Sequence, residues 1–291
     1  MDFFWPLILI RWIHLGSLLI LFGASCFALY DRRLPDDTKT FPWLAWLAFL
    51  TACCWIIVSL ADIVGDVDGL ASTATWRAFF METGFGRMWG VRLAGLLTLL
   101  IFVSPFSSRS GKGQISAICG LSAGLLVSAA WLGHAAGAEG IEWYGATMSY
   151  GCHVLGAGVW LGGLLPLSRS LRQPTELAAM QATLERFSRV GMVVVFLIVA
   201  SGIVNTYLRS VGIEDLIATS YGRVLSLKLV LFLALIGLAA TNRWVFLRRL
   251  RTDAESAKPL HSLRRSVALE QILGASIVAV AVVLGAMPPN E

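Results

Sequence analysis

Histidine and sulfur side chains gather at one corner of the chain, where two apolar segments meet. His134 lies near the end of the first segment, and Met148, Cys152 and His153 lie near the beginning of the second. The short connection between the segments is acidic and contains no Lys or Arg. An imidazole inside an apolar span is costly unless it has a partner, so it marks a candidate functional site. Two imidazoles beside a thiol and a thioether favour a soft metal ion.

A further histidine lies in the first apolar segment of the chain. His14 follows Arg11 by three residues, so the two side chains share one face of a helix. At 1.5 Å per residue, His14 lies roughly 10–15 Å below the outer surface, similar to the depth expected for His153. A metal-ligating role and a hydrogen-bonded packing role are both open for His14.

Helical geometry ranks the histidines above the sulfur residues. Met148 and Cys152 are four residues apart and share a helix face, which lies about 100° away from the face of His153. All three side chains could bind one ion only between those faces. Trp160 lies on the face of His153, two turns further along, where we expect it to support the imidazole rather than to act as a ligand.

Polar residues on other apolar segments are candidates for supporting roles. Asn205 lies at nearly the depth of the histidines, where it could hydrogen-bond to a ligand imidazole and fix its tautomer. Lys228 lies about 10 Å inside the membrane and needs a counter-charge, for which Glu270 and Asp62 are available. Asp62 could instead pair with Arg92.

The composition places these residues in a membrane protein. The chain is 57% hydrophobic and only 14% charged, with a mean hydropathy of +0.73, whereas soluble proteins have about 25% charged residues. Its five cysteines all lie in apolar spans and include no CxxC pair, so we expect no disulfide framework. The net charge of +5 is not gathered on a basic soluble face, so we expect no nucleic-acid partner. We expect a lipid bilayer around the bundle.

Apolar runs of roughly 20 residues recur along the chain, each long enough to cross the bilayer as a helix. The sequence predicts an all-α, polytopic bundle and one domain over residues 1–291. Basic residues gather at alternate connections, fifteen on one side against Arg77, Arg87 and Arg209 on the other. This bias predicts that both termini are periplasmic. The eight predicted helices are about 5–30, 41–64, 89–105, 114–136, 146–168, 185–208, 222–248 and 264–286.

A set of residues spread over about 150 positions has a specific order and spacing. It comprises Gly133-His134, His153, Trp160-Leu161-Gly162-Gly163, Arg186-Phe187-Ser188, Ser201-Gly202, Asn205, Tyr221-Gly222, Lys228, Asn242-Arg243 and Glu270, with Gly86, Trp89 and Arg92 earlier in the chain. This arrangement resembles the copper resistance protein D family, integral inner-membrane proteins of bacterial copper-handling operons. The N-terminal third matches more loosely.

The resemblance implies copper transport or copper tolerance at the bacterial inner membrane, and imidazole, thiol and thioether groups suit copper. His134 and His153 are the expected primary ligands, His14 the expected third, and Met148 and Cys152 softer candidates. The sequence has no fused copper-binding domain and no Met-rich or His-rich tail, which implies a separate periplasmic copper chaperone. It also has no phosphate-binding loop, and we expect no enzymatic activity.

Two other functions are compatible with the same residues. Histidines on separate helices of an apolar bundle also suit bis-histidine ligation of haem b in an electron-transfer protein. The third possibility is a scaffold that delivers copper to another protein without moving it across the membrane. A Soret band would identify the haem protein, and partner-dependent copper loading would identify the scaffold.

Overall fold

The computed structural model describes residues 3–31, 37–65, 67–104, 111–132, 140–172, 177–209, 211–212, 214–248 and 257–288. Throughout these ranges the secondary structure is helical, without strands, and eight helical segments are long and apolar enough to cross a membrane. The prediction of an all-α, eight-span membrane bundle is confirmed.

The spans agree with the predicted ranges to within several residues. They are α1 (Phe4–Tyr30), α2 (Phe41–Val64), α4 (Gly84–Val103), α5 (Lys112–Val127) with η3 (Ser128–Leu132), α6 (Gly140–Ala157) with η5 (Gly158–Gly162) and α7 (Gly163–Ser170), α8 (Leu177–Tyr207), α10 (Ser220–Thr241) with η6 (Asn242–Phe246), and α12 (Ala257–Leu284). Short elements lie between them: η1 (Asp37–Thr40), η2 (Asp68–Ala71), α3 (Thr73–Glu82) and α9 (Asp215–Ala218).

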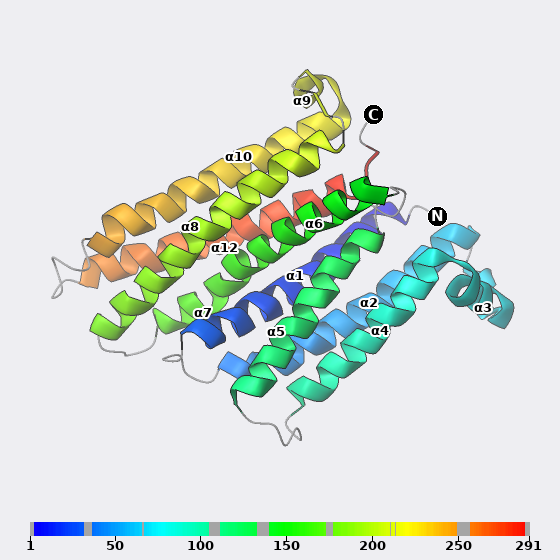
Figure 1. The fold of residues 1–291 in the computed structure, drawn as a ribbon, viewed down its shortest axis with the longest axis horizontal. Coiled ribbons are helices and arrows are strands. Elements are labelled where there is room, and N and C mark those ends of the chain that lie inside the picture. Colours follow the sequence, from blue (N-terminus) through cyan, green and yellow to red (C-terminus); the bar gives the residue numbers. More distant parts are fainter. Residues whose placement is uncertain are drawn as a thin grey trace.

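Helix α1 lies in the middle of the bundle (Figure 1). It packs against α2 and α5 on one side, and against η5, α7 and α12 on the other. Glycines let α1 and η5 approach closely, because a Cβ atom on Gly23 would lie only 2.1 Å from the carbonyl oxygen of Gly158. A Cβ atom on Gly162 would lie equally close to the carbonyl oxygen of Leu19. Small residues at helix crossings are typical of membrane bundles.

The fifth span changes its winding at this crossing. Residues 158–162 form a π-helical turn, and Pro166 follows inside α7. Proline has no amide hydrogen, and its ring would clash with the carbonyl of the residue four positions earlier, which is Gly162. The wider π turn ends at that carbonyl, so the proline accounts for the local change of winding.

The long connection before the third span contains a helix of its own. The sequence predicts an amphipathic segment there, and α3 occupies its centre with Phe79 buried and Met81 exposed. Thr83 then accepts a hydrogen bond from the amide of Gly86 (2.9 Å), which caps a new helix. Consequently α4 begins at Gly84, earlier than the predicted start at residue 89.

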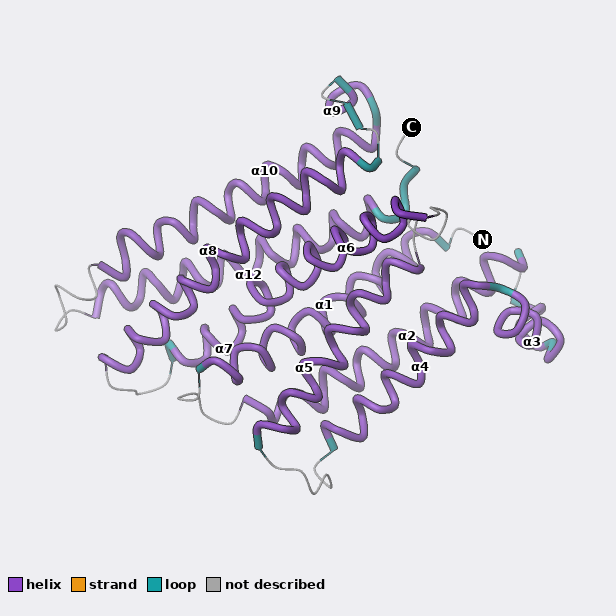
Figure 2. Tube along the Cα trace, viewed as in Figure 1, coloured by secondary structure: helices purple, strands orange, loops and turns teal. Residues whose placement is uncertain are grey.

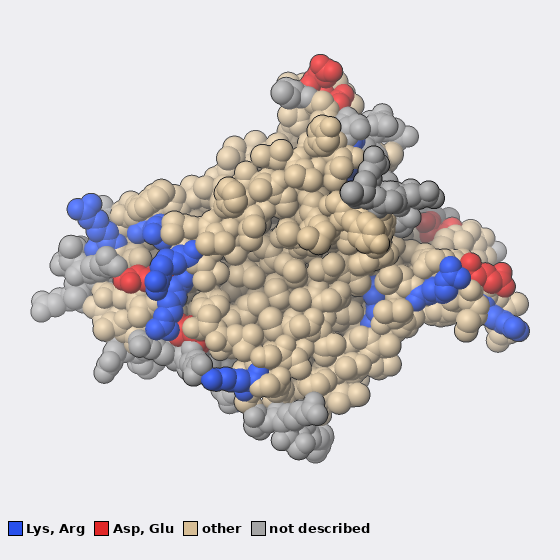
Figure 3. All heavy atoms as spheres, viewed as in Figure 1, with Lys and Arg blue, Asp and Glu red and all other residues tan. Residues whose placement is uncertain are grey.

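The two termini lie at the same end of the bundle, as an even number of spans requires (Figure 2). Figure 3 shows Lys and Arg gathered mainly at the opposite end, with a broad belt of uncharged residues between and a smaller charged group beside α3. This distribution is the one from which we predict periplasmic termini.

Candidate functional site

His153 lies on α6 and faces α8. Its Nδ1 atom lies 3.2 Å from the carbonyl oxygen of Ile198 and 3.2 Å from Oγ of Ser201. The Ser201 hydroxyl donates its own hydrogen to the carbonyl of Leu197 (2.6 Å), so its oxygen is an acceptor for the imidazole. Both neighbours of Nδ1 therefore accept, which places the ring proton on Nδ1 and leaves the lone pair on Nε2.

The packing of α6 against α8 fixes this orientation. Ser149, one turn before His153, donates a hydrogen bond to the carbonyl of Ser201 (3.0 Å). Gly156, one turn after, has so little space that an added Cβ would lie 3.0 Å from a side-chain carbon of Ile198. Ser149, His153 and Gly156 thus share the face of α6 that contacts α8. Trp160 is buried further along and makes its ring contact with Phe232 of α10 (6.3 Å between centroids).

Two cationic side chains act electrostatically on this histidine. Lys228 on α10 and Arg209 beyond the end of α8 both interact electrostatically with His153. Arg209 also donates a hydrogen bond to the hydroxyl of Tyr221. Glu270 is 2% exposed and accepts a hydrogen bond from the Asn242 amide. Over the ranges that the structure describes, Lys228 forms no ion pair with either expected carboxylate.

His14 has a different environment, because both of its ring nitrogens have partners. It is fully buried, and its Nδ1 lies 2.9 Å from the carbonyl oxygen of Ala48. Its Nε2 lies 2.9 Å from Nη2 of Arg92. Arginine only donates, so Nε2 accepts and Nδ1 donates. The rings of Trp55 and Trp89 pack edge-on against the imidazole. This geometry corresponds to the hydrogen-bonded packing role that the sequence left open.

Arg92 is 1% exposed, and α5 and η3 supply its other partners. Its Nη1 donates to the carbonyl of Leu125 (2.6 Å) and to the hydroxyl of Ser128 (2.5 Å). Asp62, the expected alternative partner, is exposed at the end of α2 and interacts electrostatically with Arg11. The bond between His14 and Arg92 joins residues 78 positions apart, and nothing in the sequence pattern predicts it.

The remaining candidate ligands do not meet His153 in this arrangement. Met148 is 69% exposed and Cys152 is exposed, so both lie on the outer surface of α6, as their helical position predicts. Asn205 lies on α8 one turn beyond Ser201 and has no hydrogen bond within the described ranges. His134 lies outside the residues that the structure describes. Among those it does describe, no three His, Cys, Asp or Glu side chains form a metal-binding group.

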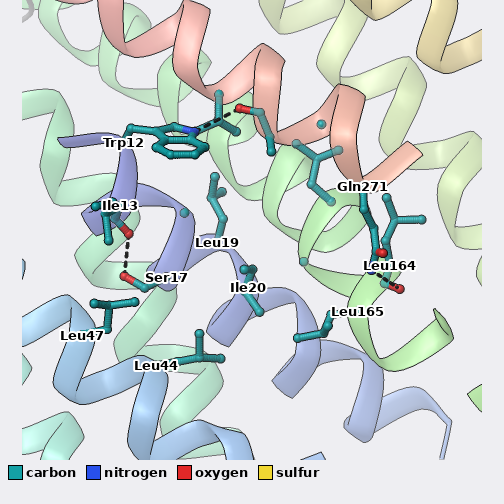
Figure 4. Close-up of a pocket in the computed structure, with 16 residues that line it drawn as sticks. Trp12, Ile13, Ser17, Leu19, Ile20, Leu44, Leu47, Leu164, Leu165 and Gln271 are labelled. Carbon is teal, nitrogen blue, oxygen red and sulfur yellow. Dashed lines mark hydrogen bonds between the residues drawn. The ribbon is translucent and has the colours of Figure 1, made fainter. Parts of the chain in front are cut away.

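A cavity of about 420 Å³ lies between α1, α2, η5, α7 and α12 (Figure 4). Its polar residues are already bonded: the Trp12 indole donates to the carbonyl of Ala275 (3.0 Å), and the Gln271 amide donates to the carbonyl of Leu164 (3.2 Å). Among the described residues, those that line the cavity include no imidazole, thiol or carboxylate. This cavity therefore suits hydrocarbon rather than a metal ion.

Comparisons with known proteins match nearly the whole chain. Residues 1–146 match the family model described as "Copper resistance protein D-like, N-terminal domain", and residues 181–284 match "Copper resistance protein D". The chain is 29% identical to Copper resistance protein D of Pseudomonas syringae pv. tomato, over 97% of this chain and 96% of that protein. It is 27% identical to Inner membrane protein YebZ of Escherichia coli (strain K12), over 97% and 98%.

A third relative is matched over a smaller part. Copper transport protein CutJ of Bacillus subtilis (strain 168) is 28% identical over 73% of this chain and 38% of its own length. No solved structure matches the chain.

Proposed function

Since this chain belongs to the copper resistance protein D family, we propose that it binds copper at His153 and moves the ion across the bacterial inner membrane. The observation that carries the proposal is the orientation of this imidazole. Ile198 and Ser201 hold the proton on Nδ1, so Nε2 keeps a lone pair for a metal. A hydrogen bond donated by the ring nitrogen that does not bind the metal orients a ligating histidine and raises the basicity of the nitrogen that does.

The chemistry of the region favours copper in its monovalent form. Imidazole is a suitable copper ligand. Coulomb energies scale with the product of the charges, so the nearby Lys228 and Arg209 oppose Cu(II) twice as strongly as Cu(I). His134 remains a proposed second ligand. The copper-related names of two relatives support the same cargo.

We further propose that a periplasmic copper chaperone donates the ion and that the protein catalyses no chemical reaction. The sequence has no phosphate-binding loop, so the movement of copper would follow its own gradient, another gradient or handover to a partner. The inner-membrane location is supported by the name of the Escherichia coli relative and by the eight apolar helices.

The test is the copper content and absorption spectrum of detergent-purified protein. We expect about one copper ion per chain at this site in the wild type, its loss in His153→Ala, and no Soret band. His261→Ala is the matched control, because it removes an imidazole that is exposed at the other end of the bundle. Unchanged copper content in His153→Ala, or a Soret band, would contradict the proposal.

Uptake into proteoliposomes separates transport from delivery. Wild-type protein should admit Cu(I) to a chelating dye inside the vesicles, and His153→Ala should reduce the rate at least tenfold, in line with lost metal-ligand contacts. Copper binding without any uptake would instead make the protein a delivery scaffold.

A further inference from the structure

Two thiols from different spans meet near the end of the bundle opposite the termini. Cys26 lies four residues before the end of α1, and Cys119 lies seven residues after the start of α5. Their Sγ atoms are 3.2 Å apart. All five cysteines are in described ranges and all are free thiols, and this is the pair that comes into contact.

The surroundings of the pair are mostly apolar but include hydroxyl groups. Both cysteines are half-buried against the core cluster formed by α1, α2, α4 and α5. Ser25 is fully buried and lies within hydrogen-bonding reach of the Cys119 thiol. Tyr30, one turn after Cys26 on α1, has a buried hydroxyl with no hydrogen-bond partner in the part of the chain that the structure describes. Such a site is shielded from water and has oxygen atoms beside the sulfur atoms.

We propose that Cys26 and Cys119 form a two-coordinate Cu(I) site inside the membrane. Thiolates are soft ligands that select Cu(I). A monovalent ion with a filled d shell accepts two ligands in line. Binding releases both thiol protons, so that two thiols and one Cu⁺ give a bis-thiolate complex of charge −1 and two H⁺, with no change of oxidation state.

The geometry requires only a small adjustment. Metal–thiolate bonds are about 2.3 Å long for zinc, and two such bonds in line place the sulfur atoms roughly 4–5 Å apart. The two thiols must therefore separate by about 1–1.5 Å from their present contact. Side-chain rotation provides this movement, because neither cysteine is completely enclosed.

This inference rests on the proposed function for its choice of copper as the cargo. The position of the thiol pair adds a second site to that function. His153 lies in the half of the fifth span (α6 with η5 and α7) that is nearer the termini, whereas the thiols lie nearer the opposite end of the bundle, where the basic residues gather (Figures 1 and 3). The two sites thus lie in different halves of the bundle. The thiol pair provides a second copper-binding site, selective for Cu(I).

The test is an anaerobic titration of the purified, reduced protein with Cu(I) in competition with bicinchoninate. We expect Cys26→Ser/Cys119→Ser to lose one Cu(I) equivalent relative to the wild type. The matched control is Cys53→Ser/Cys54→Ser, which also removes two thiols. These are adjacent on α2 and point in directions about 100° apart, so the control should keep the full stoichiometry.

X-ray absorption at the copper edge identifies the ligands. In His153→Ala, the remaining copper should show sulfur neighbours, and adding Cys26→Ser/Cys119→Ser should remove them. The single variants Cys26→Ser and Cys119→Ser should each lower the affinity at least tenfold while eluting as folded protein. Equal stoichiometry in the wild type and in Cys26→Ser/Cys119→Ser would overturn the inference, as would a Cys26–Cys119 disulfide that persists under reducing conditions.

The two proposals fail separately in this design. If the thiol pair binds copper but His153→Ala changes nothing, the proposed function at His153 is wrong and the thiol site stands. If His153→Ala loses copper but the thiol variants do not, the inferred thiol site is wrong and the proposed site at His153 stands.

Discussion

His14 and His153 differ in how many of their ring nitrogens the neighbouring helices occupy. Arg92 and Ala48 engage both nitrogens of His14, whereas α8 engages only Nδ1 of His153. A metal at His14 would have to displace a buried guanidinium that has two further partners. Two histidines of similar predicted depth therefore receive different roles, one in packing and one as a candidate ligand.

The hydroxyl of Ser201 provides a test of the tautomer at His153. Ser201→Ala removes one of the two acceptors that hold the proton on Nδ1. We expect copper affinity to fall about tenfold, the lower limit for loss of such a supporting bond, with little change in folding. A chelator competition titration measures the affinity. Ser276→Ala is the control, because that hydroxyl also bonds to its own helix but lies on α12. Equal affinities would show that Ile198 alone fixes the ring.

For single residues, the sequence predicts which helix face a side chain occupies better than it predicts which residue the side chain contacts. Helical spacing correctly puts Met148 and Cys152 on a different face from His153. The partner of His153 is different from the expected Asn205, since Ser201 lies one turn closer. The bond between His14 and Arg92 depends on the lateral positions of α1 and α4, and helical periodicity carries no information about such positions.

Between α1 and η5, backbone atoms rather than side chains set the spacing. The glycines on both sides leave no room for a methyl group at the crossing. The same span carries His153 one turn before this crossing, where it contacts α8. None of these glycines contacts the candidate site.

Two alanine substitutions on α1 test the crossing. Gly23→Ala should lower the stability by at least 1–3 kcal/mol, because the new methyl would overlap the carbonyl of Gly158 and force the helices apart. Gly16→Ala is the control on the same helix, because its added Cβ would meet nothing within 4 Å. The midpoint of thermal unfolding in detergent measures the difference. Equal midpoints for the two variants would mean that the crossing adapts without cost.

The sequence predicts the elements of this bundle well because a membrane span has a strong signal. About 20 apolar residues in a row identify a helix regardless of its neighbours. The signal weakens at the ends, where caps and short helices decide the boundaries. Thr83 illustrates the point, since its capping bond to Gly86 starts α4 within a segment expected to lie at the interface.

For the whole molecule, the charge distribution makes a prediction about orientation. With both termini outside the cytoplasm, alkaline phosphatase fused after Glu291 should be active, because this enzyme folds only in the periplasm. The same reporter fused after Arg109, in a basic connection, should be inactive. Activity assays on whole cells read out both fusions. The opposite pattern would reverse the orientation and place His153 toward the cytoplasm.

The two matched family models divide the chain between spans that lie on different sides of α1 (Figure 1). Residues 1–146 include α1 to α5, and residues 181–284 include α8 to α12. At the end of the bundle opposite the termini, Arg186 of α8 lies 3.3 Å from the buried carboxylate of Asp31, just after α1. This ion pair connects the two matched regions directly.

The central place of α1 has a consequence for biosynthesis. Translation produces this helix before the other seven described spans, yet its Trp12 indole bonds to Ala275, which lies 263 residues later in the chain. During synthesis α1 must therefore remain in the lipid with one side uncovered until the last span has been inserted. Domains of a growing chain tend to fold from the N-terminus. In this bundle α1 acquires α12 as a neighbour only after the intervening spans have been made, so the translocon or a membrane chaperone has a long interval in which to shield it.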